Sequence, residues 1–430
     1  MLFKYLLIYI AVYFGLLTSF FFVFVLFENR KKIKNVAPPK KLPFVSVIIP
    51  AYNEGMHIAK TITSVANLNY PKNKLEIIVV DDGSIDDTYN VAKKIAKRFG
   101  NLKIKIFRKK NGGKASAMNL GIVRAKGEFV AGLDADSFVT PDALMKMIGY
   151  FSDSTVMSVT PSLKVYKPRG ILRRIQALEY LWGVFLRKTF SFINTIHVAP
   201  GPFSIFRKSF FEKHGYFDEN NLTEDTEIAL RIQKNNYRIE NSMDANVYTV
   251  APSSFSALLK QRLRWYYGYT KNVQQYSELF SPKYGYLAMF ALPTAFISVF
   301  ILIALMGYLA WEMIDQWIRT ISNLNAINFD LSVLFSFKNF EWGHLPYIFT
   351  SPVTVFIVIT FALGLMLTLV AKYKSNEKES IKLNYLYFLL FYSIFYVFWW
   401  LVALGFRLFG GKVEWGSKIK IADKSKESNG

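Results

Sequence analysis

The segment Val45–Gly55 reads VSVIIPAYNEG and decides the fold. Its first six residues, Val45–Pro50, are largely apolar and β-branched and predict a buried strand, which ends in the polar loop PAYNEG. Similar short runs predict strands at 75–80, 103–107, 128–133 and 156–159, with helices between them at 56–68, 86–99, 114–125 and 141–151. This alternation predicts parallel β-α-β units, and therefore an α/β, Rossmann-like doubly wound sheet.

Polar side chains follow three of the predicted strands, where sheets of this class bind ligands. The residues at these ends are Tyr52 and Glu54 in PAYNEG, Asp81 and Asp82 in DDGS, and Asp134 and Asp136 in LDADS. A lone DDGS would be an ordinary turn. Several carboxylates at one edge repel one another unless a cation is bound, so the set predicts Mg²⁺ or Mn²⁺ on Asp134 and Asp136, beside a substrate diphosphate.

Two further segments have both a structural and a functional interpretation. Asn111–Lys114 (NGGK) fails the spacing of a phosphate-binding P-loop, yet Lys114 at a helix start is suited either to a phosphate or to plain helix initiation. The segment LTEDTEIALRIQ places Thr223, Glu224 and Asp225 before a helical pattern. Capping explains one such residue, but it does not require all three.

Long apolar runs indicate a membrane protein, since 52% of the residues are hydrophobic. The runs that are long enough to span are 3–27, 284–311, 345–371 and 383–409. Basic residues that follow the first run and fill the loop 372–382 predict that residues 30–282 are cytoplasmic and that 312–344 lie outside. Alternation then places the lysine-containing tail outside, against the charge rule; one re-entrant or interfacial segment would remove that conflict.

The net charge of +22 does not indicate nucleic-acid binding, because the lysines are spread along the chain and no nucleic-acid module signature occurs. Anionic membrane lipids and a phosphorylated substrate fit this charge better. The chain has no cysteine, which excludes disulfides and thiolate chemistry, and its four histidines lack metal-site spacing.

The stretch Phe255–Tyr269, FSALLKQRLRWYYGY, is predicted to form an interfacial helix, as is 169–190. On a helical wheel one side gathers Phe255, Leu258, Leu259, Leu263 and Tyr266, while Gln261, Arg264 and Gly268 lie opposite and Trp265 on the boundary. Lys260 and Arg262 fit headgroup contacts or snorkelling side chains. The prediction is that one face seats the helix at the membrane and the other closes the reaction site.

Together these segments resemble family 2 of the glycosyltransferases, in particular the membrane-embedded synthases of hyaluronan, chitin, cellulose and poly-N-acetylglucosamine. The matching pieces are VSVIIPAYNE, VVDDGS, GGKASAMNLG, LDADS, GPFSIFRKS, LTEDTEIALRI and QRLRW, in the family's order over about residues 44–270. The resemblance implies a GT-A fold, a nucleoside-diphosphate sugar donor and an inverting single displacement.

The resemblance also implies roles for individual residues. The residues expected to contact the donor are Tyr52, Glu54, Asp81, Asp82, Lys114, Asp134, Gln261 and Arg264, and those expected to bind the metal are Asp134 and Asp136. The expected catalytic residues are Asp225, as general base, and Glu224. Contacts with the acceptor are expected from Gly201, Pro202 and Trp265. The resemblance favours a uridine donor, because an aspartate can accept from the N3–H of uracil; the N1–H of guanine offers a similar donor, so that a GDP-sugar is the alternative. The resemblance leaves room for a homo-oligomer.

The implied organisation is a transmembrane anchor (1–29), a basic linker (30–43), a GT-A domain (44–252), an interfacial helix segment (253–282), transmembrane helices (283–411) and a polar tail (412–430). Three functions stay open at this point. They are a processive polysaccharide synthase, a transferase that adds one sugar to a membrane lipid, and a non-catalytic sugar-binding or export module. The intact carboxylate and QxxRW residues argue against the last, because binding alone needs no base.

Overall fold

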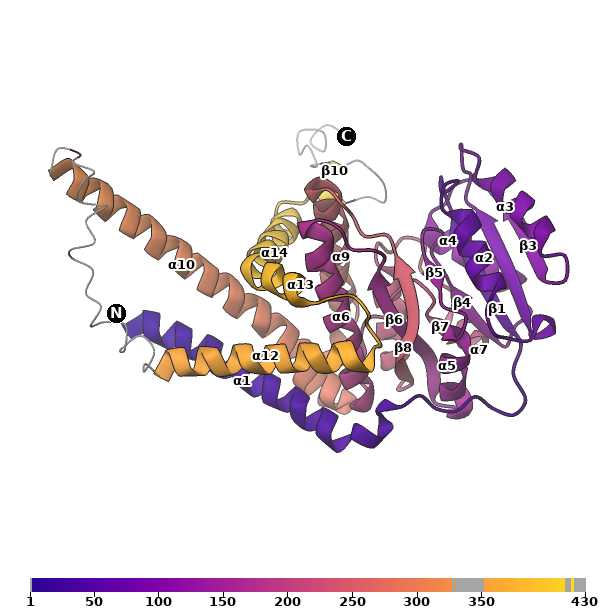
Figure 1. Ribbon diagram of the computed structural model, residues 1–430, viewed down its shortest axis with the longest axis horizontal. Coiled ribbons are helices and arrows are strands. Elements are labelled where there is room, and N and C mark those ends of the chain that lie inside the picture. The colour runs from indigo at the N-terminus through magenta and orange to yellow at the C-terminus, as the bar shows by residue number, and fades with distance from the viewer. Residues whose placement is uncertain (1, 327–328, 330–351, 414–418, 421–430) are drawn as a thin grey trace, which may run out of the picture. The chain divides into compact units, whose positions relative to one another are not determined.

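The computed structural model describes residues 2–326, 329, 352–413 and 419–420 (Figure 1). Its contacts divide the chain into two units, each formed by two stretches of sequence. One comprises Met1–Phe27 and Pro293–Leu369; the other comprises Glu28–Leu292 and Val370–Gly430. The second unit contains all the residues that the sequence assigns to the reaction site.

An eight-stranded sheet of order β3-β2-β1-β4-β7-β6-β8-β5 is the centre of the second unit (Figure 1). Its strands are β1 (Val45–Ala51), β2 (Leu75–Asp81), β3 (Lys103–Arg108), β4 (Phe129–Gly132), β5 (Phe138–Val139), β6 (Val156–Val165), β7 (Ile205–Arg207) and β8 (Arg238–Thr249). The strands β1 to β4 pair in parallel, as predicted. The sequence did not predict β5, β7 and β8, of which β7 is antiparallel to β4 and β6, so that the sheet is mixed.

The parallel register explains why the polar loops meet. Ala51 at the end of β1 pairs with Asp81 at the end of β2, and Ile48 pairs with Gly132 at the end of β4. The chain therefore leaves all three strands at the same edge, and their polar loops lie beside one another.

Helices cover both faces of the sheet. On one face, buried side chains of β1 and β2 pack with α2 (Ile58–Ala66), α3 (Thr88–Arg98) and α5 (Ala143–Ile148). On the other, they pack with α4 (Lys114–Arg124), α7 (Lys208–His214) and α8 (Glu224–Lys234). The strands are buried on both faces, which explains their continuous apolar sequences.

Two long amphipathic helices flank this domain, α6 (Ile171–Phe192) and α9 (Phe255–Gln275). The last apolar segment, which comprises α13 (Lys382–Tyr387), a π-helical turn (Phe388–Tyr392) and α14 (Ser393–Leu408), packs against both of them. On α9, Phe255 contacts Phe395 and Phe398, and Tyr266 stacks on Trp400 at 4.7 Å between ring centroids. The apolar face of α9 is thus covered by α14.

Four helical segments in the described part of the chain are long and apolar enough to cross a membrane, as predicted. They belong to α1 (Leu2–Glu28), to α10 (Leu292–Ala326) with the turn before it, to α12 (Pro352–Lys374), and to the segment 382–408. The helix predicted to end at 311 continues to Ala326. The predicted start of the third span at 345, and most of the tail 412–430, lie outside the described residues.

Candidate active site

The first two strand-end loops are tied to each other. Asn53 donates its backbone N–H to the Ser84 hydroxyl at 3.0 Å and accepts the N–H of Ile85 at 2.9 Å. Gly83 adopts φ +77°, and a Cβ there would lie 2.9 Å from the backbone nitrogen of Asn111, so a larger residue is disfavoured. Tyr52 projects from this pair of loops with 48% of its surface exposed, which leaves its ring available to a ligand.

Basic groups hold the two aspartates of DDGS. Asp81 is paired with Arg108, whose Nε lies 3.0 Å from Asp81 Oδ2. Asp82 accepts from Lys109 Nζ at 2.8 Å and from the backbone N–H of Gly113 at 2.7 Å. The DDGS loop and the NGGK loop therefore form one rigid wall at the start of α4. Whether Asp81 and Asp82 contact a nucleotide base stays a prediction.

Lys114 joins the third strand-end loop to the start of α8. Its Nζ lies 2.7 Å from Asp134 Oδ1 and 3.2 Å from Glu224 Oε1. Burial alone would lower the pKa of Lys114, but Asp134 and Glu224 outweigh it and raise that pKa. Gly201 lies against this cluster beside the buried Pro202, and a Cβ at Gly201 would come within 2.6 Å of Lys114 Nζ. The sequence-predicted residues of four separate motifs are thus in one place.

The carboxylates at this edge destabilise one another's charge. Burial, followed by the negative charge of Asp136, raises the pKa of Glu54 to about 7. Burial and Asp134 likewise raise the pKa of Asp136, whose Oδ1 accepts the Ser137 hydroxyl at 2.9 Å. A cation would relieve this repulsion. Among the described residues no cluster of three or more acidic or histidine ligands forms a cage. Such a cage is not required for Mg²⁺, which is commonly held by one or two carboxylates together with substrate phosphates.

Asp225 lies in the first turn of α8. Burial, and secondly the charge of Glu224, raise the pKa of Asp225 to about 6, against the opposing effects of Lys114 and Arg264. Its Oδ1 accepts the backbone N–H of Thr226 at 2.8 Å, which orients the carboxylate. Thr223 occupies the N-cap position, but its hydroxyl makes no capping bond. A carboxylate with this pKa is suited to remove a proton near neutral pH.

Several contacts fasten helix α9 to the start of α8. Arg264 Nη1 donates to the carbonyl of Leu222 at 3.0 Å, and Asn272 Nδ2 donates to the Thr223 hydroxyl at 2.9 Å. A Cβ on Gly268 would lie 2.5 Å from Thr223 Oγ1, so the two helices touch closely at this glycine. These contacts explain how QxxRW and TED, far apart in sequence, share one site.

The remaining QxxRW residues are Gln261 and Trp265, on the same helix as Arg264. The side-chain oxygen of Gln261 is buried and has no hydrogen-bond partner in the part of the chain that the structure describes, which leaves this amide for a ligand. Trp265 packs under the guanidinium of Arg262, with Arg262 Cζ 4.1 Å from the ring centroid. The prediction that Arg262 is a headgroup contact or a snorkelling side chain is wrong, because its side chain is 0% exposed and is paired with Glu179. Lys260 is exposed, as predicted.

Glu179 and Arg187 of α6 were not among the predicted site residues, because 169–190 was predicted only to be an interfacial helix. Glu179 meets Arg262, with 2.6 Å between Oε2 and Nη2. Arg187 is within electrostatic reach of Asp225, and burial lowers its pKa to about 10. The sequence contains one indication that Glu179 has a special role, because it is the single acidic residue in the sequence of α6.

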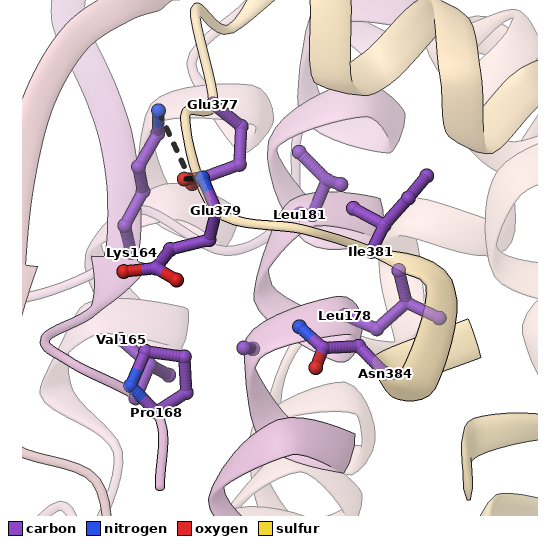
Figure 2. A pocket seen from close by; sticks show the side chains of 10 residues that line it. Lys164, Val165, Pro168, Leu178, Leu181, Glu377, Glu379, Ile381 and Asn384 are labelled. Atoms are coloured by element: carbon purple, nitrogen blue, oxygen red, sulfur yellow. Dashed lines mark hydrogen bonds and ion pairs between the residues drawn. The ribbon is translucent and has the colours of Figure 1, made fainter. Parts of the chain in front are cut away.

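A small cavity lies apart from the carboxylate cluster, between α6 and the segment that precedes α13 (Figure 2). Its volume of about 20 Å³ suffices for one water molecule. Lys164 at its wall pairs with Glu377 at 3.3 Å and donates to the carbonyl of Ser375 at 2.8 Å. This cavity marks where residues 375–381 are anchored to the catalytic domain, and not a substrate site.

Comparison with known proteins identifies the sheet domain. Residues 46–215 match Glycosyl transferase family 2. The chain is 33% identical over 243 residues to the poly-beta-1,6-N-acetyl-D-glucosamine synthase of Staphylococcus aureus, covering 56% of this chain and 57% of the relative. It is 32% identical over 230 residues to the synthase of the same name from Staphylococcus epidermidis, covering 52% and 54%. The match thus spans little more than half of these relatives' length.

One solved structure supports the fold. Mannosyltransferase PcManGT from Pyrobaculum calidifontis, in complex with GDP-Man and Mn²⁺, is similar with a TM-score of 0.56 and 21% sequence identity, over 88% of this chain and 99% of that chain. The predicted resemblance to family 2 and the predicted GT-A fold with candidate membrane helices are confirmed.

Proposed function

We propose that this chain is a membrane glycosyltransferase that extends a polysaccharide from a UDP-sugar. The proposal starts from the glycosyl transferase family 2 match of residues 46–215 and from the GT-A fold. The observation that carries the proposal is the position of Lys114, which bridges Asp134 of the donor edge and Glu224 beside Asp225. A donor diphosphate at Asp134 would then present its sugar to the base.

The donor is assigned to the edge formed by the three strand-end loops. Tyr52 and the DDGS loop are proposed to hold the nucleoside, with a carboxylate of Asp81 or Asp82 accepting the N3–H of uracil. Lys114, Gln261 and Arg264 are proposed to contact the diphosphate. Arg264 is fixed to Leu222 through Nη1, and the planar geometry of a guanidinium suits phosphate oxygens.

Asp134 and Asp136 are the residues that would hold a divalent metal, with Glu54 nearby. When bound, Mg²⁺ or Mn²⁺ would neutralise charge on the leaving diphosphate. Burial, together with the charge of Asp136 on Glu54 and of Asp134 on Asp136, raises the pKa values of Glu54 and Asp136 and supports this assignment.

Asp225 is proposed to remove the proton from the acceptor hydroxyl as its oxygen attacks the anomeric carbon. The bond to the diphosphate breaks on the opposite face, so that the configuration inverts and no covalent enzyme intermediate forms. Base catalysis of this kind contributes roughly 10²- to 10⁴-fold. The acceptor is assigned to the side of Trp265, with Gly201 and Pro202 beside the transfer point.

The similarity to poly-beta-1,6-N-acetyl-D-glucosamine synthases supports N-acetylglucosamine as the sugar and a β-1,6-linked polymer as the product. The basic residues Arg30, Lys31 and Lys32 directly after α1 support a cytoplasmic catalytic domain. The contacts of the segment 382–408 with α6 and α9 support an acceptor site next to the membrane. Processive elongation is proposed on the basis of this proximity.

Detergent-purified protein incubated with radiolabelled UDP- and GDP-sugars and Mg²⁺ or Mn²⁺ tests the proposal. Transfer from UDP-N-acetylglucosamine into long products, abolished by chelation, is the expected result. A product that contains a single sugar on a lipid would establish the alternative, glycolipid synthesis. Absence of transfer from every donor would refute the catalytic assignment.

A further inference from the structure

Arg262 is the most deeply buried cation of α9, and its position does not follow from the reaction proposed above. Its side chain is 0% exposed, and Nη2 lies 2.6 Å from Glu179 Oε2 on α6. Its Nε and Nη1 are buried and have no hydrogen-bond partner in the described part of the chain. The ion pair therefore involves only the Nη2 of the guanidinium.

Aromatic rings lie near the remainder of this guanidinium. Arg262 Cζ is 4.1 Å from the ring centroid of Trp265 and 5.4 Å from that of Trp399 in α14. Glu179 is held from a second side, because the Tyr392 hydroxyl donates to Glu179 Oε1 at 3.3 Å. A single group of contacts therefore connects α6, α9 and the membrane segment 382–408 directly behind Trp265.

A buried ion pair is a poor source of stability compared with well-packed apolar residues of the same volume. What it provides here is orientation, since the pair and the ring stacking fix the plane of the guanidinium. Lysine could keep the charge but not the flat surface that stacks on an indole. Trp265 rests on that surface one helical turn after Arg262, so its ring orientation depends on this support.

We propose that Arg262 is a positioning residue that holds Trp265 as the platform for the acceptor sugar, and that Glu179 and Tyr392 fix this platform to the segment 382–408. The inference rests on the proposed function and extends it. It makes the retention of the product chain depend on Arg262, which is assigned no contact with the donor and is paired with Glu179 and not with the carboxylates of the donor edge. Loosening Arg262 weakens the acceptor side and leaves donor binding intact.

The test compares Arg262→Met, Arg262→Lys and Glu179→Gln with a matched control, Lys260→Met, which removes an exposed cation two residues away on the same helix. UDP-N-acetylglucosamine is the donor, and short β-1,6-linked N-acetylglucosamine oligomers are the acceptor probe. The apparent KM for each, kcat and the product length are measured. Arg262→Met should raise the acceptor KM by about tenfold and shorten the products, while the donor KM stays within about twofold.

Arg262→Lys should fall between wild type and Arg262→Met, and Lys260→Met should match wild type. If Arg262→Met does not survive purification, the comparison of Arg262→Lys with Lys260→Met decides the question. Unchanged acceptor KM and product length in the Arg262 variants would overturn the inference, as would a parallel rise of both KM values. Wild-type protein that transfers from no donor would instead overturn the proposed function, and this inference with it.

Discussion

The proposed donor edge and the proposed acceptor wall of the site are built in different ways. The donor edge consists of loops directly after β1, β2 and β4, and each loop is held mainly by its neighbours at the same edge, as in the bond between Asn53 and Ser84. The acceptor wall consists of helices, and its central contact joins Glu179 to Arg262. One half depends on local motifs and the other on tertiary packing, so substitutions in the two halves should have separable effects.

The largest effect is expected where the two halves meet. Asp225→Asn removes the base and keeps the size of the side chain, so kcat should fall by roughly 10²- to 10⁴-fold with little change in the donor KM. Initial rates of transfer measure it. The control is Glu212→Gln, which changes an exposed carboxylate on α7 and should leave the rate unaltered. Near wild-type turnover in Asp225→Asn would remove Asp225 from the mechanism.

Trp265→Ala should affect the acceptor wall alone. An aromatic side chain offers about 150–250 Å² of surface, so its removal should lower kcat/KM for the acceptor by about tenfold to a hundredfold. Donor binding should persist, and it is measured as the protection that UDP gives against thermal unfolding. The protein should still fold and insert into the membrane. Trp317→Ala, at an exposed position on α10, is the control. Equal losses for donor and acceptor would mean that the two halves are not separable.

The pH dependence of the transfer rate tests the role of Asp225, which lies where the two halves of the site meet. A base must be deprotonated, and the pKa of Asp225 is raised to about 6, so the rate should be steady above that pH and fall about tenfold per unit below it. Glu224→Gln removes a carboxylate that raises this pKa, so the midpoint should move to lower pH. Transfer rates in a buffer series of constant ionic strength provide the measurement. A midpoint that is the same in Asp225→Asn would assign the titration to another group.

The sequence predicted the donor edge because its chemistry is local. Asp82 and Asp134 follow apolar runs that predict buried strands, and parallel strands deliver their ends to one edge. It did not predict the acceptor wall, because Glu179 and Arg262 are 83 positions apart and nothing local signals their pairing. Arg262 was assigned to lipid for this reason. The antiparallel strand β7 was missed because its three residues are too short for a periodic pattern.

The smallest effect is expected from a substitution that strains the backbone of the donor edge, at Gly83. Gly83→Ala forces a side chain into φ +77° and against Asn111, so it should lower the free energy of unfolding by about 1–2 kcal/mol. Thermal unfolding in detergent measures it, and the donor KM should rise while the acceptor KM does not. Gly100→Ala is the control, because a Cβ there meets nothing within 4 Å. A stable variant with an altered acceptor KM would contradict the division of the site.

The central claim is that one base and one displacement join the two halves. The most direct measurement is the anomeric configuration of the first sugar transferred from an α-linked UDP-sugar, read by proton NMR of the isolated product. A β-linked product is expected, since the acceptor attacks from the Asp225 side and the diphosphate leaves from the other. An α-linked product would contradict the claim, because a single displacement from the face opposite the leaving diphosphate cannot retain the configuration.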